Sequence, residues 1–172
     1  MALLTDEIRR FIGVESEEVE ACEPVERGAV RRYAQAIMDE DPIYAQEDAA
    51  ARFGGPAAPL LYPAFMFRRP FGTPDPLSER ALDPDFDGLV PASGSGLPEL
   101  PLPGLALLNG GAEVVFHRYA RHGEKVIQKS QYADIYEKES KTGPMLMVVI
   151  ETEYRTSAGE LLLRARKTLI RR

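Results

Sequence analysis

The spacing of apolar residues changes near residue 109, from a helical period before it to a strand period after it. Between Gly28 and Asp39 the apolar positions recur at i, i+3, i+4, i+7 and i+8, which is the spacing of one helical face; they are Val30, Tyr33, Ala34, Ile37 and Met38. This pattern predicts a helix that ends at Asp39. A turn around Pro42 follows.

Two further short helices are predicted in this first part. Residues 47–55, "EDAAARFGG", have the composition of a short helix closed by Gly54 and Gly55. In residues 63–67, "PAFMF", Pro63 suits the first turn of a helix, because its fixed φ is helical and its missing N–H is not needed there. The segment is apolar nearly all round, so we expect it to be buried.

The second part of the chain predicts strands. From Asn109 onward, "ARHGE", "KESKTGP" and "TSAGE" each carry a glycine suited to a turn, which predicts an antiparallel meander of about four strands. The six apolar residues from Met145 to Ile150 indicate a central strand covered on both faces, and residues 161–170 a strand with one solvated face. Helices followed by long antiparallel strands predict an α+β domain whose sheet wraps a buried helix, with 63–67 as that helix.

Between the two parts lies a segment rich in proline and glycine, residues 70–104, which holds eight of the 14 prolines. Regular structure is not expected there. A structureless segment of this length inside a compact domain is usually a lid, a binding loop or a linker. We interpret it as a long excursion over the surface, placed to cover a tunnel.

Size, charge and cysteine content narrow the class of protein. A chain of 172 residues, 1–172, has the size of one domain. The net charge of −6 argues against nucleic acid as a partner, since phosphate binding needs a basic face. Cys22, the only cysteine, excludes a disulfide framework and is expected to be a small buried thiol. The acidic amino terminus and the lack of a long apolar run predict a cytoplasmic protein without a membrane span.

Four stretches carry a resemblance to a known family: "YAQAIMDEDPIYAQEDAAARFGG", "APLLYPAFMF", "LNGGAEVVFHRYARHGEKV" and "RARKTLIRR". Together they resemble the MaoC-like dehydratases of the hot-dog fold, and more closely the amino-terminal, degenerate type of hot-dog domain. The resemblance implies a single hot-dog domain, in which residues 70–104 are a loop insertion.

The stretch around Asp39 is the most specific part of the resemblance. Catalytic members of the family carry D-x-N-P-[LIV]-H, whose Asp and His activate the water that adds to a trans-2-enoyl thioester to give an (R)-3-hydroxyacyl thioester. Here Asp39 and Pro42 match, Asp41 replaces the Asn, and Tyr44 replaces the His. A phenol, with a pKa near 10, is a poor base at neutral pH, where an imidazole is a good one. We therefore expect little turnover from this chain alone.

The resemblance also implies a substrate-binding region. In catalytic members backbone N–H groups near the start of the buried helix hold the thioester carbonyl, beside a His-Gly pair that Tyr62 and Pro63 replace here. The implied substrate-binding residues are Tyr62, Ala64, Phe65 and Arg68. Basic residues could meet the phosphates of coenzyme A or an acidic carrier protein, either Arg68 with Arg69 or the group Arg164, Arg166 and Lys167.

Degenerate domains of this type pair with a domain that has the Asp/His dyad, which implies a heterodimer with a separate catalytic MaoC-like subunit acting on an acyl thioester. Two alternatives remain open: a self-sufficient homodimeric hydratase that uses Asp39, and a non-catalytic acyl-thioester binding or regulatory module. No metal or cofactor is expected for this reaction. Asp39 and Tyr44 could also be purely structural, closing a turn and packing in the core. His117 and His122 are not expected to be catalytic, and His122 is expected to be solvated in its turn.

Overall fold

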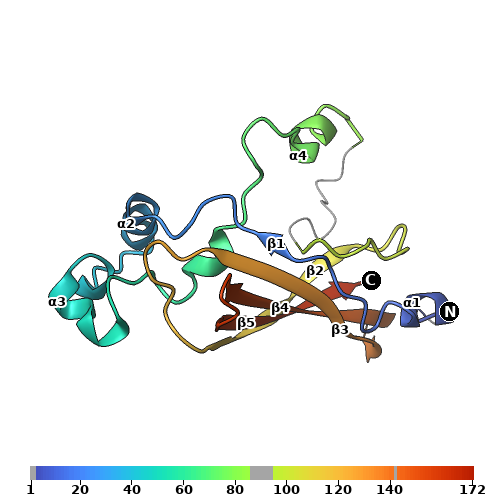
Figure 1. Cartoon of the computed structure of the whole chain (residues 1–172). Helices are drawn as coiled ribbons and strands as arrows, with labels where there is room; N and C mark the ends of the chain where they lie inside the picture. The colour runs from blue at the N-terminus through green and yellow to red at the C-terminus, as the bar shows by residue number, and fades with distance from the viewer. Residues whose placement is uncertain (1–2, 86–94, 142) are drawn as a thin grey trace.

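The computed structural model describes residues 3–85, 95–141 and 143–172. The α-helices are α1 (Asp6–Arg9), α2 (Arg27–Ala36), α3 (Glu47–Ala50) and α4 (Pro76–Arg80), and the 3₁₀ turns are η1 (Pro42–Tyr44), η2 (Ala51–Phe53) and η3 (Tyr62–Phe65). The strands are β1 (Val19–Glu20), β2 (Leu107–Phe116), β3 (Val126–Ser140), β4 (Gly143–Thr156) and β5 (Leu161–Arg171). In Figure 1, α2 and α3 lie at one end of a long antiparallel sheet and α1 at the other, while α4 stands away from it. None of the described helices is long and apolar enough to cross a membrane.

The sheet confirms the predicted strands but corrects their order. The order is β1-β3-β4-β5-β2, so β3, β4 and β5 form a meander while β2 crosses over to pair with β5. The prediction of one four-stranded meander was therefore wrong, because alternation identifies a strand and not its neighbour. The prediction of a central strand is confirmed: β4 lies in the middle of the sheet, and residues 146–150 are all buried.

The two edges of the sheet differ in how they are covered. Along β3, β1 and the preceding segment occupy the backbone groups; Gly13 N–H donates to the Tyr132 carbonyl at 2.8 Å, and Ser16 N–H donates to Ser130 at 2.8 Å. On the opposite side β2 is the outermost strand, with exposed apolar side chains at Leu108, Val115 and Phe116. Among the described residues no strand pairs with the outer side of β2, so this is the open edge of the sheet, which natural proteins usually cover.

A bulge in β2 explains two of its glycines. The register with β5 shifts between Asn109 and Ala112. A Cβ on Gly110 would lie 3.0 Å from the Thr168 carbonyl oxygen, and Gly111 has φ +108°. Close approach and positive φ both require glycine here, so the strand bends at this point on the edge.

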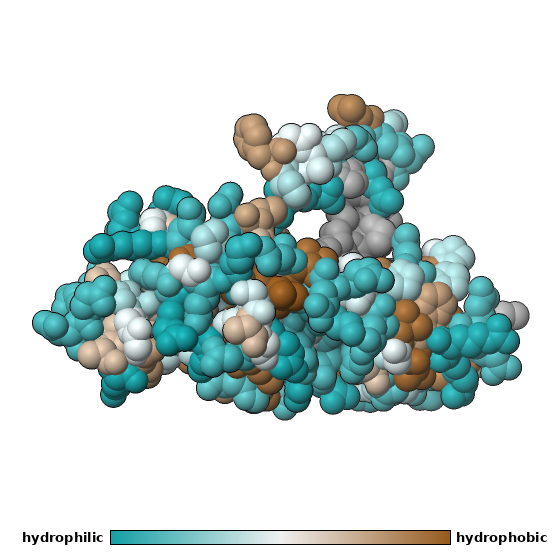
Figure 2. Space-filling view, in the orientation of Figure 1, coloured by the Kyte–Doolittle hydropathy of each residue, from teal (hydrophilic) through white to brown (hydrophobic). Residues whose placement is uncertain are grey.

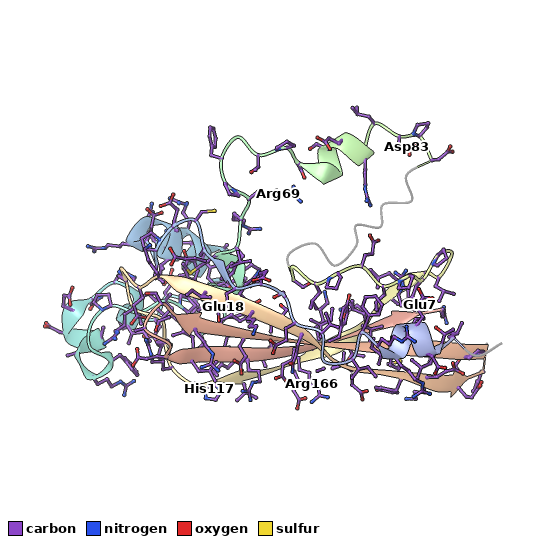
Figure 3. All side chains as sticks on the ribbon, turned by 45° about the vertical axis from the view of Figure 1, so that its right-hand side comes forward. Glu7, Glu18, Arg69, Asp83, His117 and Arg166 are labelled. Atoms are coloured by element: carbon purple, nitrogen blue, oxygen red, sulfur yellow. The ribbon has the colours of Figure 1, made fainter. Side chains whose placement is uncertain are left out.

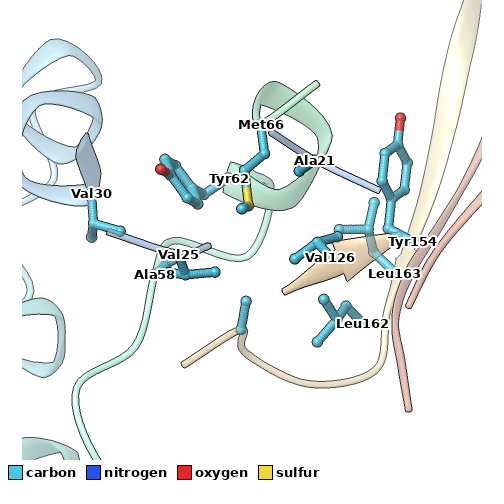
Figure 4. Close-up of a cluster of buried hydrophobic side chains, with 11 residues drawn as sticks. Ala21, Val25, Val30, Ala58, Tyr62, Met66, Val126, Tyr154, Leu162 and Leu163 are labelled. Carbon is cyan, nitrogen blue, oxygen red and sulfur yellow. The ribbon is translucent and has the colours of Figure 1, made fainter. Parts of the chain in front are cut away.

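Two apolar clusters hold the layers together. One joins the helical side to the sheet and is shown in Figure 4; it contains Val25, Val30, Tyr62, Met66, Val126, Tyr154, Leu162 and Leu163. The other lies under α1 and the later part of the proline-rich segment, and contains Ile8, Leu102, Tyr132, Ile135, Leu146, Val148 and Ile150. Cys22 is in neither cluster: it is exposed, and its thiol donates to the Arg68 carbonyl at 3.2 Å. The expectation of a buried thiol was wrong, because Cys22 follows Ala21 directly and its side chain leaves the core that Ala21 enters.

The predicted helices form, although the third is shorter than expected. α2 covers the predicted pattern up to Ala36 and so ends before Asp39, with Ile37 and Met38 in the turn that closes it, and α3 with η2 ends at Gly54, whose φ is +82°. The 63–67 segment forms only the single turn η3, with Tyr62, Pro63 and Met66 buried but Phe65 46% exposed. Pro63 lies in the first turn, where it is tolerated, but the turn ends at Phe65, well before Pro70, so the expected helix over residues 63–67 does not form.

The proline-rich segment divides into two parts with different structure. Residues 97–105 lie against the sheet, where Leu97, Leu100 and Leu105 pack on the second cluster. Residues 70–85 stand away from the body and include α4, as Figures 1 and 3 show, so the expectation of no regular structure was wrong for Pro76–Arg80. The expectation of a surface excursion fits only the later part. Residues 86–94 of this predicted loop lie outside the described residues.

Candidate active site at the Asp39–Tyr44 turn

The end of α2 sets the position of Asp39. Met38 N–H donates to the Gln35 carbonyl at 3.2 Å and Asp39 N–H donates to the Ala34 carbonyl at 3.0 Å, the paired bonds of a Schellman ending. Met38 takes the left-handed conformation with φ +57° and is 88% exposed. A residue with a Cβ adopts this conformation at a cost of roughly 1–2 kcal/mol, so the turn is held by its surroundings.

Asp39 and Tyr44 are in direct contact. The Tyr44 hydroxyl donates to Oδ2 of Asp39 at 2.7 Å, and the Asp41 N–H donates to Oδ1 of Asp39 at 3.2 Å. Asp41 in turn caps η1 by accepting from the Ile43 N–H at 3.0 Å. Both carboxylate oxygens of Asp39 therefore accept hydrogen bonds that close the loop between α2 and η1. Both structural roles considered for this pair are observed: Asp39 closes a turn, and Tyr44 packs against the core.

The environment of Tyr44 keeps its phenol protonated. Its side chain is half-buried and packs against the cluster that contains Tyr62. Burial, then the hydrogen bond to Asp39 and the negative charge of Asp39, raise the pKa of Tyr44 well above its ordinary value of 10.0. At neutral pH this group donates a proton in a hydrogen bond and does not act as a base.

Three aromatic side chains, Tyr33, Tyr62 and Phe65, pack together in the implied substrate-binding region. Tyr33 of α2 packs edge-on to Tyr62 at a centroid distance of 5.3 Å and against Phe65 at 5.2 Å. Tyr62 is buried, Ala64 is half-buried and Phe65 is open to solvent. The sequence did not single out Tyr33 as a site residue, because its helical face is visible in the pattern but its contact with residues 62 and 65 depends on the tertiary fold.

The backbone donors in this region are already occupied. Tyr62 N–H donates to the Pro59 carbonyl at 2.8 Å, and Ala64 N–H donates to the Leu61 carbonyl at 3.1 Å. Pro63, between them, has no N–H. A pair of free, convergent N–H groups that could bind a developing oxyanion is therefore not formed by residues 62–64.

The basic residues considered for phosphate binding differ in whether their side chains already have partners within the chain. Arg68 is exposed, whereas Arg69 donates to the Pro74 carbonyl at 2.8 Å. On β5, Arg164 forms ion pairs with Glu153 at 2.5 Å and Glu151 at 3.5 Å, while Arg166 and Lys167 are exposed. Arg164 is thus held within the sheet.

The two histidines lie outside the turn. His117 is exposed. His122 is half-buried, its Nε2 atom is buried without a hydrogen-bond partner, and its backbone N–H donates to the Pro56 carbonyl at 3.1 Å. The expectation that His122 is solvated was wrong, because the 56–57 loop packs over its turn. In the described part of the chain, no three His, Cys, Asp or Glu side chains gather closely enough to hold a metal ion.

The sequence matches the family described as "FAS1-like, dehydratase domain region" over residues 10–165. The chain therefore belongs to this family of MaoC-like hot-dog dehydratase domains. No curated protein matches the sequence.

Solved structures with the same fold include both complexes and single proteins. The ChsH1-ChsH2 complex from Mycobacterium tuberculosis is 20% identical with a TM-score of 0.66, over 95% of this chain and 86% of that one. A MaoC-like dehydratase from Rhodospirillum rubrum is 20% identical with a TM-score of 0.58, over 94% and 93%. The truncated HadBC (3R-hydroxyacyl-ACP dehydratase) complex, also from M. tuberculosis, is 18% identical with a TM-score of 0.57, over 93% and 96%. These likenesses confirm the predicted α+β hot-dog fold.

Proposed function

We propose that this chain is the non-catalytic subunit of an (R)-specific enoyl-thioester hydratase or 3-hydroxyacyl-thioester dehydratase. A MaoC-like partner with an intact dyad would supply the chemistry. The observation that carries the proposal is the 2.7 Å hydrogen bond in which Tyr44, at the place of the family's histidine, donates to Asp39.

The chemistry of the turn supports this assignment. Hydration of an enoyl thioester needs a group that takes a proton from water and returns one near neutral pH. A phenol with a raised pKa that already donates to a carboxylate cannot take that proton. The occupied N–H groups of Tyr62 and Ala64 would also leave the thioester oxygen without a paired donor here.

The open edge of the sheet supports the need for a partner. Along β2 the outward backbone groups lie beside the exposed side chains of Leu108, Val115 and Phe116. A second hot-dog domain that pairs its sheet with this edge would satisfy the backbone and cover these side chains. Two of the similar structures, ChsH1-ChsH2 and HadBC, are complexes of two named components, which favours a heteromer.

The substrate would be an acyl thioester bound beside η3. In this proposal Tyr62, Ala64 and Phe65 contact the acyl part, and the exposed Arg68 meets a phosphate of coenzyme A or of a carrier protein. The reaction requires neither a metal nor a redox cofactor. The proposal places the chain in the cytoplasm, a reducing compartment to which its single free thiol is suited.

The test is hydration of crotonyl-CoA and of a longer 2-enoyl-CoA by the purified chain, by a hot-dog protein with an intact D-x-N-P-x-H motif, and by the mixture. We expect no turnover from the chain alone and a higher rate on the longer substrate in the mixture. Turnover by the chain alone that Asp39→Asn abolishes would instead establish a self-sufficient hydratase. Thioester binding without turnover in any mixture would establish a binding module.

A further inference from the structure

The most exposed apolar side chains on the described chain, apart from Met38, lie in residues 70–85, called the arm below. Phe71 is 110% exposed and Leu82 is 87% exposed, relative to their fully accessible values. Residues 71–75 and 78–85 are exposed without exception. Figures 2 and 3 show the arm projecting from the body in two orientations. No described residue of this chain therefore covers these two apolar side chains.

The arm nevertheless has a defined shape of its own. Thr73 N–H donates to the Pro70 carbonyl at 3.2 Å, and Asp83 N–H donates to the Arg80 carbonyl at 2.9 Å. At the start of α4 the Ser78 hydroxyl donates to Asp75 at 2.7 Å. Local turns and prolines thus preorganise the arm, which lowers the entropy lost when such a segment docks on another surface.

The charge of the arm indicates what kind of surface it fits. It carries Asp75, Glu79, Asp83 and Asp85 against a single base, Arg80, so its net charge of −3 is half of the chain's −6. An acidic segment is repelled by the phosphates of coenzyme A, by an anionic membrane and, more weakly, by a second copy of this acidic chain. The complementary surface is an apolar patch with a basic rim on a different protein.

The root of the arm adjoins another uncovered apolar area. The arm follows η3, where Leu61 is 37% and Phe65 is 46% exposed. Phe65 contacts Tyr33, and Ile37, the residue that caps the end of α2, is 46% exposed. One partner seated over Leu61, Phe65 and Ile37 would therefore lie next to the root of the arm.

We propose that the arm is a docking element that packs Phe71 and Leu82 onto a basic-rimmed apolar patch of the second hot-dog subunit. This inference rests on the proposed function, because the partner is the same dyad-bearing subunit. The inference adds a second contact between the subunits, away from the β2 edge, and assigns this contact to the early part of the proline-rich segment.

The test compares the affinity of three chains for one probe, a purified hot-dog subunit with an intact dyad motif. Phe71→Ser/Leu82→Ser removes the apolar tips, and Ile12→Ser/Val19→Ser removes two exposed apolar residues elsewhere as a matched control. We expect the arm variant to bind roughly 10- to 100-fold more weakly by titration calorimetry, and the control to bind within about twofold of wild type. Thermal unfolding of each free chain verifies that both variants fold.

Two further measurements examine charge and accessibility. Asp83→Lys/Asp85→Lys is expected to slow association several-fold at low salt, with the difference lost at high salt. Trypsin is expected to cut after Arg80 in the free chain and to be blocked there in the complex.

The outcomes separate this inference from the proposed function. If wild-type chain and probe form no complex, the proposed heteromer itself fails. If they form an active complex that the arm variant joins with unchanged affinity, and Arg80 stays cleavable, the docking arm is overturned while the proposed function stands. Unchanged partner affinity with a raised KM for a long enoyl-CoA would also overturn docking, and would assign the arm to the substrate.

Discussion

Tyr44 and Asp39 are joined by a hydrogen bond of 2.7 Å in which the phenol is the donor and the carboxylate the acceptor. The resemblance places these residues where catalytic family members have His and Asp. Here the contact between them closes a turn: Tyr44 keeps its proton, and its hydrogen bond occupies an oxygen of Asp39 that a base would use to accept a proton from water.

The first prediction concerns the stability that this contact provides. Tyr44→Phe removes the donor and leaves Asp39 with one partner, the Asp41 N–H. We expect the free energy of unfolding to fall by about 1.5–3 kcal/mol, as for a hydrogen bond to a charged acceptor, in a denaturant titration. Hydratase activity of the complex with its partner should stay within about twofold. Tyr136→Phe, at an exposed position, is the control for loss of a hydroxyl. A large loss of activity with unchanged stability would make Tyr44 a catalytic residue.

The second prediction concerns restoration of the motif. Tyr44→His combined with Asp41→Asn recreates D-x-N-P-I-H in the chain. We expect hydration of crotonyl-CoA by this variant alone to stay at background, because Pro63 has no N–H and the N–H groups of Tyr62 and Ala64 are occupied. Turnover by the variant, measured against the same protein with Asp39→Asn, would show that the remaining site is more complete than we infer.

A third prediction concerns Glu124, which organises the turn before β3. It accepts hydrogen bonds from both terminal nitrogens of Arg118 and from the backbone and guanidinium of Arg121. Glu124→Gln is expected to cost about 1–3 kcal/mol of unfolding free energy. The matched control, Glu20→Gln, breaks the exposed pair with Lys125 and should cost less than about 1 kcal/mol.

The stability that Glu124 contributes should also depend on pH. Burial opposes ionisation, but the hydrogen bonds from Arg118 and Arg121 prevail and lower the pKa of Glu124 below its ordinary value of 4.5. The ionised form is thus favoured in the folded chain, so the stability it contributes is present above about pH 4.5 and is lost as the pH falls toward the lower folded-state pKa. The destabilisation caused by Glu124→Gln should shrink over that range. A penalty that stays constant down to pH 3 would contradict this role.

The fourth prediction concerns His122. Burial and then the charge of Arg27 lower the pKa of His122, against opposing contributions from the Ala57 backbone and Glu47. Protonation would also place a hydrogen on Nε2, which has no acceptor. Because the folded chain disfavours the charged form, stability should fall as the pH drops through about 6.5, where the unfolded chain takes up the proton.

Denaturant titrations at pH 7.5 and 5.5 examine this prediction directly. His122→Gln is expected to lose part of the difference in stability between the two pH values, whereas His117→Gln, at an exposed position, should keep it. Equal pH dependence in all three proteins would show that His122 does not contribute.

The sequence by itself determined α2, α3 and the strands that follow residue 107, together with the class of fold and the family. Helical spacing located α2, turn glycines located the ends of β3, β4 and β5, and the apolar run at residues 146–150 identified the central strand. These features depend on neighbours a few residues apart, so periodicity records them directly. The departure of Tyr44 from the family motif was visible in the same way.

Only the tertiary structure decided which of these features meet. Three features join segments distant in sequence: the crossing of β2 to β5, the packing of Tyr33 against Tyr62 and Phe65, and the burial of His122. The hydrogen bond from Tyr44 to Asp39 also depends on the tertiary structure, although the two residues are only five apart. The left-handed turn at Met38 sets how the two side chains approach each other. Periodicity records which face of an element is apolar, but a pairing partner is selected by the packing of the whole chain.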